Sequence, residues 1–478
     1  MKSKLVSNSI FYGAIGLLPV AIGLFTLPIL TRYLSPEEYG ILSMIAAFSS
    51  MVSIAATFQI YSGISRIYFD YDNEKRKVYF STLFYAVSAI ACLVFVFFLF
   101  AGDAFINILY SKSEVGFWPY FFVSVVSIFF SLPVGITTAF FKVQEKGKQL
   151  LIVSAIGTVI TTALILYLVV VELMGVMGSL VGSAMGAFLT YLFHIFYFRS
   201  NFVLRFEKSM FIENLKFGIP VIPHALGGYL FMYSDVIILE KYVAVAMIGI
   251  YAIADRFAVL LKTVVNSFSD AFNPIFMKAS KSSIEEGQKV VYDTTKSWFV
   301  ILGIGYIVLS HMGEYIIYIM TPSEYHEAAL ILPLLAMAYV FRGIYIMPIN
   351  TFYFMKKTKY LPIATLTSGT LNVLLNILLI PYIGIWGAAI TTTLSFAINW
   401  WLLEVLSSKT FKVKFDRSAL VFLFALVVVS NLLFYLMPSE DLYIRLLSQV
   451  IFVGGVILIV WFKDIGNIRE FIKARLNK

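Results

Sequence analysis

Charged residues are scarce in this chain of 478 residues: Asp, Glu, Lys and Arg make up only 13% of it, against 60% apolar residues. Soluble domains carry about a quarter of charged residues, so this composition excludes a soluble globular protein. Apolar runs of about 20 residues recur along the chain, which is the length at which a helix crosses the hydrocarbon core of a bilayer. The sequence therefore predicts an all-α integral membrane protein.

Other features are absent as well. The single cysteine, Cys92, excludes an intramolecular disulfide. No G-x-x-x-x-G-K-[ST] segment for nucleotide phosphates occurs, and the four histidines are scattered without metal-ligand spacing. The connections between apolar runs are too short to form a separate catalytic domain. We therefore expect a protein that is not an enzyme and that has no cofactor.

Apolar length predicts fourteen membrane spans. They lie at residues 8–30, 40–64, 79–101, 117–141, 150–171, 175–198, 212–239, 243–269, 298–320, 328–354, 360–380, 384–406, 418–437 and 444–462. After Trp461, Ile465, Ile468, Ile472 and Leu476 follow at helical spacing among Lys and Arg, which is typical of an amphipathic helix at the membrane surface. We expect this tail to lie on the cytoplasmic side.

The distribution of Lys and Arg predicts the orientation. Basic residues gather in both tails and in every second connection, whereas the opposite side has only Arg32, Lys112 and Lys241. By the positive-inside rule both termini are cytoplasmic, which requires an even number of spans. The net charge of +9 is then mostly a basic cytoplasmic surface, and no basic segment is long enough or interleaved with aromatics as nucleic-acid binding would favour.

An internal repeat organises the chain. An offset of 209 residues places 32–41 on 241–250 and "GVMGS" (175–179) on "GIWGA" (384–388), and a two-residue slip places "GKQLLIVSAIG" on "TKYLPIATLTS". The repeat predicts two six-helix halves, 1–210 and 211–410, followed by two further spans and the tail in 411–478. Because six is even, the halves have the same topology and form a parallel repeat around a central cavity, as in alternating-access transporters.

Polar residues inside the spans are expected to line that cavity, because they are costly in lipid. Asp255, Lys262 and Asn266 share a narrow arc at 100° per residue, with Arg256 on the adjoining face. The full set of candidates is Arg32, His224, Asp235, Asp255, Arg256, Lys262, Asn266, Arg342, Asn350, Asn372 and Asn376.

Two interpretations of the intramembrane charges stay open. Asp235, Asp255 and Asp270 could form ion pairs with Arg256, Lys262 and Arg342 that hold helices together. As a set, the cations favour a cavity of positive potential that suits phosphate. Asp235 is the residue that we expect to titrate or to serve coupling to a proton or sodium gradient, whereas a lone His224 is more often an interhelical donor than a proton relay.

Several motifs resemble a known family. "PILTRYLSPEEYGILSM" (28–44) resembles the end of the first helix of bacterial polysaccharide flippases, the O-antigen (Wzx-type) and polysaccharide-transport proteins. "FGIPVIPHALGGYLFMYSDVIIL", "GIYAIADRF" and "FNPIF" resemble their seventh and eighth helices, and "NILLIPYIGIWGAAITT" their eleventh and twelfth. The motif positions are Pro28, Tyr39, Gly40, Gly249, Tyr251, a closing Pro274, Gly384 and Gly387. The first of these motifs predicts a tight turn with Glu37 and Glu38 facing water.

The resemblance implies the multidrug/oligosaccharidyl-lipid/polysaccharide exporter (MOP) fold, with two six-helix bundles in a V. It implies a flippase that moves an undecaprenyl-pyrophosphate-linked oligosaccharide across the bacterial inner (plasma) membrane, from the cytoplasmic to the periplasmic leaflet. A polymerase and a chain-length regulator of the same pathway would be its partners, and Arg32 would lie at the periplasmic mouth. Many relatives have a basic residue after the span-7 aspartate, where this chain has Val236, so an Asp-Arg pair is not expected there.

Two other functions stay as alternatives. A multidrug or cation antiporter of the same superfamily would favour a more acidic or aromatic cavity than the one that Arg256, Lys262 and Arg342 predict. A membrane glycosyltransferase or polysaccharide polymerase would need a large periplasmic loop with catalytic residues, and the outer connections are too short for one.

Overall fold

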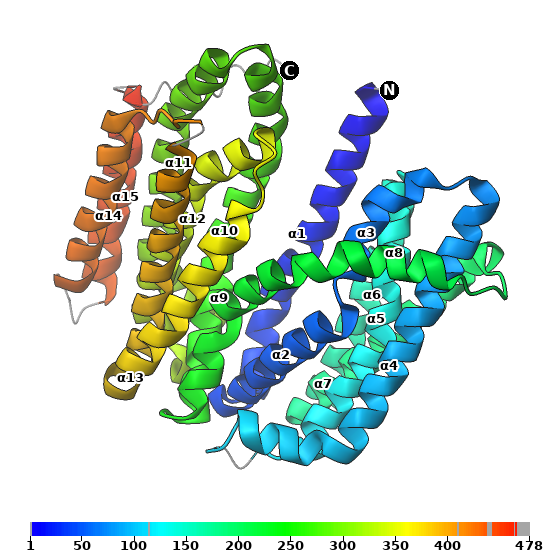
Figure 1. Ribbon diagram of the computed structural model, residues 1–478. Helices are drawn as coiled ribbons and strands as arrows, with labels where there is room; N and C mark the ends of the chain where they lie inside the picture. Colours follow the sequence, from blue (N-terminus) through cyan, green and yellow to red (C-terminus); the bar gives the residue numbers. More distant parts are fainter. Residues whose placement is uncertain (1, 113–114, 409–410, 437–441, 463, 466–478) are drawn as a thin grey trace. The chain divides into compact units, whose positions relative to one another are not determined.

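The computed structural model describes residues 2–112, 115–408, 411–436, 442–462 and 464–465 (Figure 1). Nearly all of these residues are helical, and no strand occurs among them. The predicted tail helix beyond residue 465 lies outside the described residues. The all-α prediction is therefore confirmed for the described part of the chain.

The chain separates into two compact units, residues 1–249 and 250–478. Unit 1 contains α1 (Lys2–Tyr33), α2 (Pro36–Thr57), α3 (Ile60–Ile67), α4 (Asn73–Leu109), α5 (Phe122–Val143), α6 (Gly147–Leu166), α7 (Gly175–Phe198), α8 (Lys208–Gly218) and α9 (Ile222–Glu240). Unit 2 contains most of α10 (Val245–Ser282) together with α11 (Ile284–Met320), α12 (Ala328–Phe354), α13 (Tyr360–Ser408), α14 (Arg417–Leu436) and α15 (Leu442–Phe462). The predicted boundaries at 210 and 410 concern the sequence repeat and stay a prediction.

Twelve helical segments among the described residues are long and apolar enough to cross a bilayer. This set counts α13 once, although Ile383 and Gly384 break it into two arms, and it omits α10, whose charged residues interrupt the apolar run. With the second arm and α10 the described chain has the predicted fourteen spans. Pro274 does not close its span as expected, because α10 continues through it to Ser282. A helix tolerates a proline when neighbouring groups satisfy the freed carbonyl.

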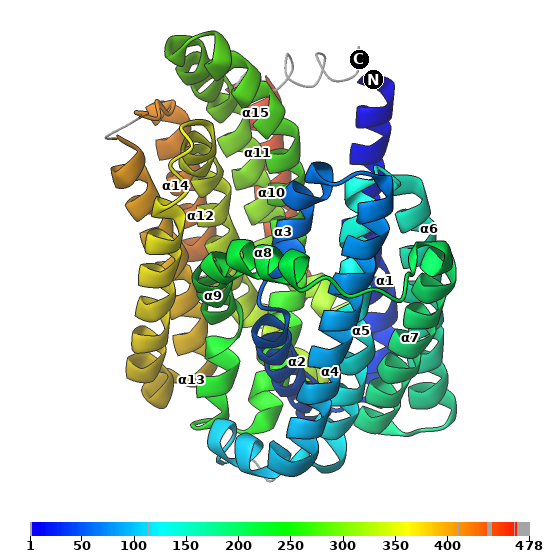
Figure 2. The same ribbon diagram turned by 45° about the vertical axis from the view of Figure 1, so that its right-hand side comes forward.

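Within unit 1, α5 packs between α4 and α7, and α6 packs on α7 and α1. Figures 1 and 2 show α8 lying across α3 and α4 before the chain enters α9, which packs on α2. The buried Asn214 of α8 fixes this crossing, since its Nδ2 donates to the Ile60 carbonyl (2.8 Å) and its Oδ1 accepts from Tyr79 OH (3.0 Å). The helices α8 and α9 thus pack with the unit that contains α1 to α7.

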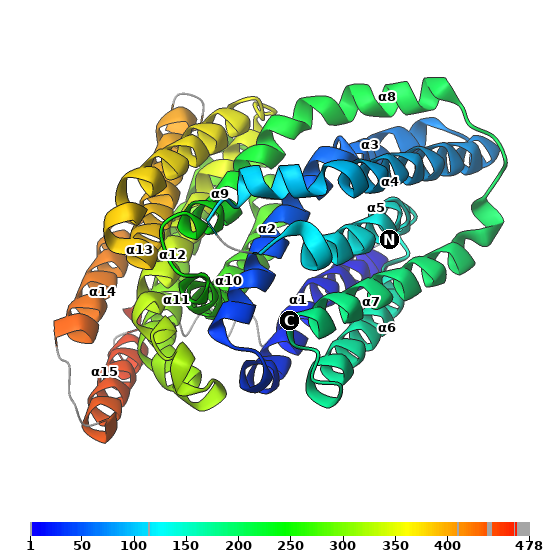
Figure 3. The same cartoon turned by 90° about the horizontal axis from the view of Figure 1, so that it is seen from below.

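Within unit 2, α11 is the central helix and contacts α12, α14 and α15 (Figure 3). A buried ion pair joins α15 to α11: Arg445 Nη2 lies 3.2 Å from Glu314 Oε2, and Tyr318 OH donates to Glu314 Oε1 (3.1 Å). His311 Nε2 and Ser430 Oγ, 3.0 Å apart, connect α11 to α14. Polar contacts therefore hold the two C-terminal helices on the rest of unit 2.

The predicted turn between the first two spans is tight, because α1 ends at Tyr33 and α2 begins at Pro36. Ser35 caps α2 in a capping box with Glu38, whose Oε2 accepts from the Ser35 N–H (2.8 Å). Glu38 Oε1 also accepts from the Val176 N–H of α7 (3.3 Å). Glu37 is exposed as expected, whereas the prediction that Glu38 only faces water was wrong, since its side chain ties α2 to α7.

The repeat appears in the backbone at two pairs of equivalent glycines. Gly175 and Gly384 both have positive φ, 53° and 52°, at the turn where each hairpin reverses direction. Gly40 and Gly249 make a reciprocal contact: a Cβ on Gly40 would collide with the Val245 carbonyl, and one on Gly249 with the Pro36 carbonyl. Because 36 and 245 are also equivalent under the 209-residue offset, the two motif glycines let the first turns of α2 and α10 cross at backbone contact.

Candidate functional site

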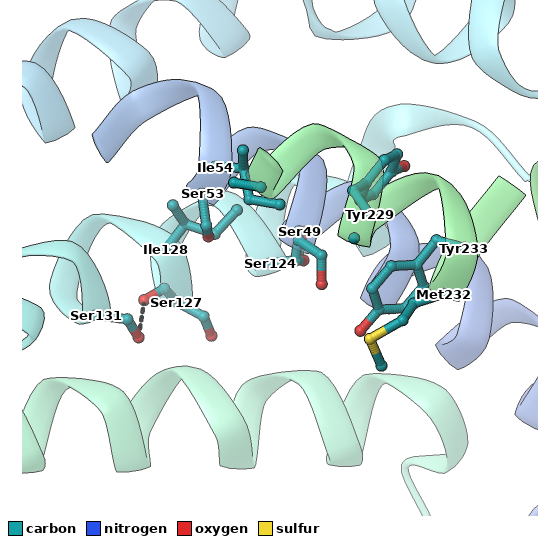
Figure 4. Close-up of a pocket in the computed structure, with 13 residues that line it drawn as sticks. Ser49, Ser53, Ile54, Ser124, Ser127, Ile128, Ser131, Tyr229, Met232 and Tyr233 are labelled. Carbon is teal, nitrogen blue, oxygen red and sulfur yellow. Dashed lines mark hydrogen bonds between the residues drawn. The ribbon is translucent and has the colours of Figure 1, made fainter. Parts of the chain in front are cut away.

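A serine-lined pocket in unit 1 is the first candidate site (Figure 4). Its volume is about 590 Å³, within the range of about 300–1,000 Å³ that is usual for small-molecule sites. It is lined by Ser49, Ser50, Ser53 and Ile54 of α2, Ser124, Ser127, Ile128 and Ser131 of α5, and Ala225, Gly228, Tyr229, Met232 and Tyr233 of α9. None of these thirteen described residues carries a charge.

Helical periodicity brings these side chains together. The lining positions recur every three or four residues along α5 and α9, so each helix turns one face to the pocket. Ser124 Oγ donates to the Phe121 carbonyl (2.7 Å) and Ser131 Oγ to the Ser127 carbonyl (2.8 Å). Such bonds to the preceding turn let a serine lie inside an apolar helix, and they leave its oxygen free to accept a further hydrogen bond.

A charged cluster in unit 2 is the second candidate site. Lys262 of α10 interacts electrostatically with Arg342 of α12 and with Asp255, about two turns earlier on the same face of α10. Asp255 Oδ1 accepts a hydrogen bond from Tyr339 OH (3.2 Å). The structure thus brings together three of the predicted residues, and Tyr339 adds a contact that the sequence did not predict.

Direct ion pairs do not neutralise this cluster. In residues 250–408, no salt bridge joins Asp255 or Asp270 to Arg256, Lys262 or Arg342. Arg256 is half-buried, and Asn266 and Asp270 are exposed. The cluster therefore contains two cations, Lys262 and Arg342, against one carboxylate, Asp255, a balance that suits an anionic group.

The three predicted asparagines lie elsewhere in unit 2. Asn372 and Asn376 are buried where the two arms of α13 meet: Asn376 Nδ2 donates to Asn372 Oδ1 (3.2 Å), and Thr391 Oγ1 donates to Asn376 Oδ1. Asn350 of α12 is buried too, and its Nδ2 has no hydrogen bond partner among the described residues. None of the three lines the serine pocket of unit 1, and their place in a translocation cavity stays a prediction.

The remaining predicted residues belong to unit 1. Arg32 is exposed in the last turn of α1, and His224 is half-buried in the first turn of α9. Asp235 is buried in α9, where its Oδ1 accepts from the Val236 N–H (2.8 Å). Among the motif residues, Tyr39 and Tyr251 are buried, whereas Pro28 lies half-buried inside α1.

Sequence reasoning missed the serine pocket and the Glu314–Arg445 pair. Charged and amide side chains stand out inside a span, whereas a single serine there is an ordinary helix residue. The signal was the recurrence, since Ser49 and Ser53 are four residues apart, and Ser124, Ser127 and Ser131 are three and four apart. Glu314 and Arg445 also lie inside predicted spans, where a matched acid and base mark a buried pair.

Solved structures show which class of protein has this fold. The chain is similar to the lipid II flippase MurJ in an inward closed conformation, with a TM-score of 0.76, 18% identity and coverage of 95% of this chain and 99% of that one. It is also similar to an inward-facing multidrug resistance MATE family transporter of the MOP superfamily, with a TM-score of 0.69, 14% identity and coverage of 85% and 95%. The fold is therefore that of MOP superfamily transporters, as the resemblance implied.

Sequence comparison then identifies the family. The family described as "Polysaccharide biosynthesis protein" matches residues 5–280, more than half of the chain, and the chain belongs to this family. The probable low-salt glycan biosynthesis flippase Agl15 of Haloferax volcanii is 26% identical over 196 residues. The matched segment spans 41% of this chain and 41% of that relative's length.

Proposed function

We propose that this protein is a flippase for a lipid-linked oligosaccharide. It moves an undecaprenyl-pyrophosphate-linked repeat unit of a surface polysaccharide from the cytoplasmic to the periplasmic leaflet of the bacterial inner membrane by alternating access. The observation that carries the proposal is the charged cluster of unit 2 within a chain of this family and fold. Lys262 and Arg342 provide positive charge inside the membrane without a direct ion pair among the described residues.

The chemistry of a pyrophosphate headgroup supports this assignment. Two phosphates removed from water need cations, and the planar guanidinium of Arg342 fits phosphate oxygens bidentately while Lys262 acts as a compact point charge. Asp255 accepts a hydrogen bond from Tyr339 and interacts electrostatically with Lys262, so this one carboxylate faces two cations, Lys262 and Arg342. Unit 2 would thus hold the anionic part of the substrate.

The rest of the proposal follows the distribution of charge along the chain. The basic tails and connections support cytoplasmic termini in this proposal, and Arg32 would then lie at the periplasmic end of α1. Asp235 is the proposed site of coupling to a proton or sodium gradient, because it is a buried carboxylate inside a span. A polymerase and a chain-length regulator would receive the translocated unit.

A deletion strain tests the proposed function. Cells without the protein should accumulate lipid-linked repeat units on the cytoplasmic leaflet and lose the surface polysaccharide, and the wild-type gene should restore both. Leaflet location is measured by the access of an impermeant sugar-modifying enzyme in inverted and right-side-out vesicles. Normal polymer in the deletion strain, with no second flippase, would overturn the proposal.

A multidrug or cation antiporter is the alternative, and the structural similarity to a MATE family transporter favours it. Susceptibility of the deletion strain to cationic drugs distinguishes the two. An antiporter gives drug sensitivity with an intact polysaccharide, whereas the flippase gives the reverse.

A further inference from the structure

We infer that the serine pocket of unit 1 is a binding site for an uncharged, hydroxyl-rich sugar. This inference rests on the proposed function and assigns the sugar portion of the substrate to a site separate from the cations of unit 2. The pocket lies wholly within residues 49–233, and the helices that form it, α2, α5 and α9, belong to one compact unit.

The hydroxyl groups of the pocket match those of a sugar. Six serines line it, and each hydroxyl offers one donor and two acceptor positions. The hydroxyls of Ser124 and Ser131 donate to backbone carbonyls, and their oxygens can still accept a hydrogen bond from a ligand. Within the described part of the chain, the hydroxyls of Ser49, Ser53 and Ser127 have no hydrogen bond partner. A sugar hydroxyl both donates and accepts, so it can satisfy both kinds of serine.

The absence of charge sets the class of ligand. Moving a carboxylate or a phosphate into this pocket would cost its hydration without supplying a cation, because no Lys, Arg or His is among the lining residues. A neutral sugar exchanges hydrogen bonds with water for hydrogen bonds with serine at little net cost. The pocket therefore discriminates against acidic sugars.

Two tyrosines give the pocket an apolar wall for the C–H face of a sugar ring. The rings of Tyr229 and Tyr233 lie 5.5 Å apart between centroids, tilted by 34°. Tyr229 OH donates to the Ala47 carbonyl of α2 (3.3 Å), which fixes that ring against the pocket. In Figure 4, Tyr233 and Met232 lie together on the α9 side, facing the serines of α2 and α5. Aromatic rings with a polar tip and an adaptable methionine suit an amphipathic ligand.

The opposite face of α2 provides an internal contrast. A second pocket, of about 570 Å³, is lined by Met51, Val52, Ala55 and Ala56 of α2, by Phe58 just after it, and by apolar residues of α4. Its lining residues include no serine, tyrosine or charged residue. Two cavities of nearly equal volume on one helix thus differ mainly in hydroxyl content, which makes Ala55 a matched control for Ser53.

Cysteine protection tests the inference on the full chain in proteoliposomes. The only native cysteine, Cys92, is exposed and is first replaced (Cys92→Ser), and Ser53→Cys is then introduced. A hydrophilic maleimide should label Ser53→Cys, and saturating methyl glucopyranoside should slow labelling about tenfold, since only the unoccupied pocket reacts. The anionic methyl glucuronide should leave the labelling rate unchanged, and Ala55→Cys should respond to neither glycoside.

Three outcomes would overturn the inference: no labelling of Ser53→Cys, labelling without protection by the neutral glycoside, or equal protection by both glycosides. If Ser53→Cys lowers membrane abundance, Ser127→Cys on α5 replaces it, with the same expectations. Because other neutral sugars could fit better, methyl galactopyranoside and methyl N-acetylglucosaminide are run as well, and failure of all three neutral glycosides counts as loss of protection.

Complementation separates this inference from the proposed function. The variant Ser49→Ala/Ser53→Ala/Ser127→Ala should restore less than about a tenth of the surface polysaccharide at wild-type membrane abundance, as loss of several ligand hydrogen bonds predicts. Full restoration by this variant in a strain whose deletion abolishes the polymer would overturn only the sugar site. An intact polymer in the deletion strain would overturn the proposed function itself.

Discussion

The helix pair α6–α7 of unit 1 and the two arms of α13 in unit 2 are equivalent hairpins that pack in the same way with different chemistry. A Cβ on Gly178 would lie 2.9 Å from the backbone of Leu168, and one on Gly387 would lie 2.9 Å from the backbone of Leu379. These residues are equivalent under the repeat once its two-residue slip is included. The small residue at this position sets the same close approach in both hairpins.

One turn further along, the two hairpins diverge. A Cβ on Gly182 would lie 2.8 Å from the backbone nitrogen of Ile165, whereas the equivalent Thr391 donates a hydrogen bond to Asn376, the equivalent of Ile165. Ser395 Oγ, in turn, donates to the Thr391 carbonyl (2.7 Å). The same backbone geometry therefore supports an apolar seam in unit 1 and a hydrogen-bonded seam in unit 2, so polar residues in a span do not by themselves indicate a cavity.

The units also differ in where polar side chains face open space. The pocket of unit 1 is neutral and rich in hydroxyls, whereas α10 of unit 2 carries the half-buried charged residues Asp255, Arg256 and Lys262. We expect unit 1 to contribute sugar contacts and unit 2 to contribute charge, and the following variants test that division.

The largest effect is expected at the shared close approach. Gly178→Val and Gly387→Val place a branched side chain against backbone atoms that cannot move away, so the destabilisation should exceed the usual cost of overpacking. Each variant should reduce the amount of folded protein in the membrane to less than about a tenth of the wild-type amount. Folded protein is measured as the monodisperse peak of a fluorescent fusion in detergent. Gly454→Ala is the control, since no atom lies within 4 Å of a Cβ there. A folded variant in only one hairpin would break the structural equivalence.

The next effect is expected at the ion pair that joins α15 to α11. Arg445→Ala leaves the Glu314 carboxylate buried without a cation, and we expect a loss of about 3–5 kcal/mol in the free energy of unfolding. The double variant Glu314→Gln/Arg445→Met should recover most of this loss, because it removes both charges. Thermal unfolding in detergent measures each variant. Equal stability of the single variant and the wild type would show that the pair does not hold α15.

Polysaccharide export should distinguish the role of the charged residues of unit 2 from that of the buried hydrogen bonds between the two arms of α13. Lys262→Ala and Arg342→Ala should lower polysaccharide export about 10- to 100-fold, as expected for loss of a charge-assisted contact, with unchanged membrane abundance. Arg256→Ala should do the same if Arg256 also contacts the headgroup. Lys262→Arg, which keeps the charge, is the matched control. Reduced abundance instead of reduced export would favour a structural role for these cations.

A smaller effect is expected in the polar seam of α13. Asn376→Leu removes the acceptor for Thr391 and introduces an apolar side chain, as Ile165 provides in the other hairpin, so the cost should be about 1–2 kcal/mol. Asn376→Leu combined with Thr391→Gly recreates the chemistry of Ile165 and Gly182 and should restore part of this stability. If the double variant loses as much stability as the Asn376→Leu and Thr391→Gly variants lose together, the two seams are not interchangeable.

The smallest effect is expected at the start of α14. Burial alone would raise the pKa of Asp416, but hydrogen bonds from Ser418 and from the Ala419 N–H outweigh it and lower the pKa below the usual 3.8. Because the pKa of Asp416 is lower in the folded state than in the unfolded state, its carboxylate stabilises the fold at pH values above the unfolded-state pKa. This contribution is lost as the pH falls through the folded-state pKa. Asp416→Ala should cost about 1 kcal/mol at pH 7, and this cost should shrink as the pH falls below 3.8. Melting temperatures across this pH range check it, and a cost independent of pH would contradict it.

The lengths of the apolar runs predicted much of the fold. The free-energy cost of exposing backbone polar groups to lipid forces each span to become a helix, whatever its neighbours are. The fourteen spans, the turn at Leu34 and Ser35 and the equivalence of Gly175 with Gly384 all follow from apolar length and repetition. The candidate site was predicted less well. The periodicity that placed Asn372 and Asn376 on one face of a helix could not show that the second arm of α13 covers that face.

The sequence by itself determined the class of protein, the family, the number of spans and the distribution of basic residues, since each depends on residue type along the chain. Only the tertiary structure decided which polar residues face one another. Two helices far apart in sequence, α2 and α5, gather six serines into one pocket, and α15 brings Arg445 to Glu314. The physical reason is that burial and pairing are properties of neighbours in space, whereas a helical pattern fixes only the direction in which each side chain points.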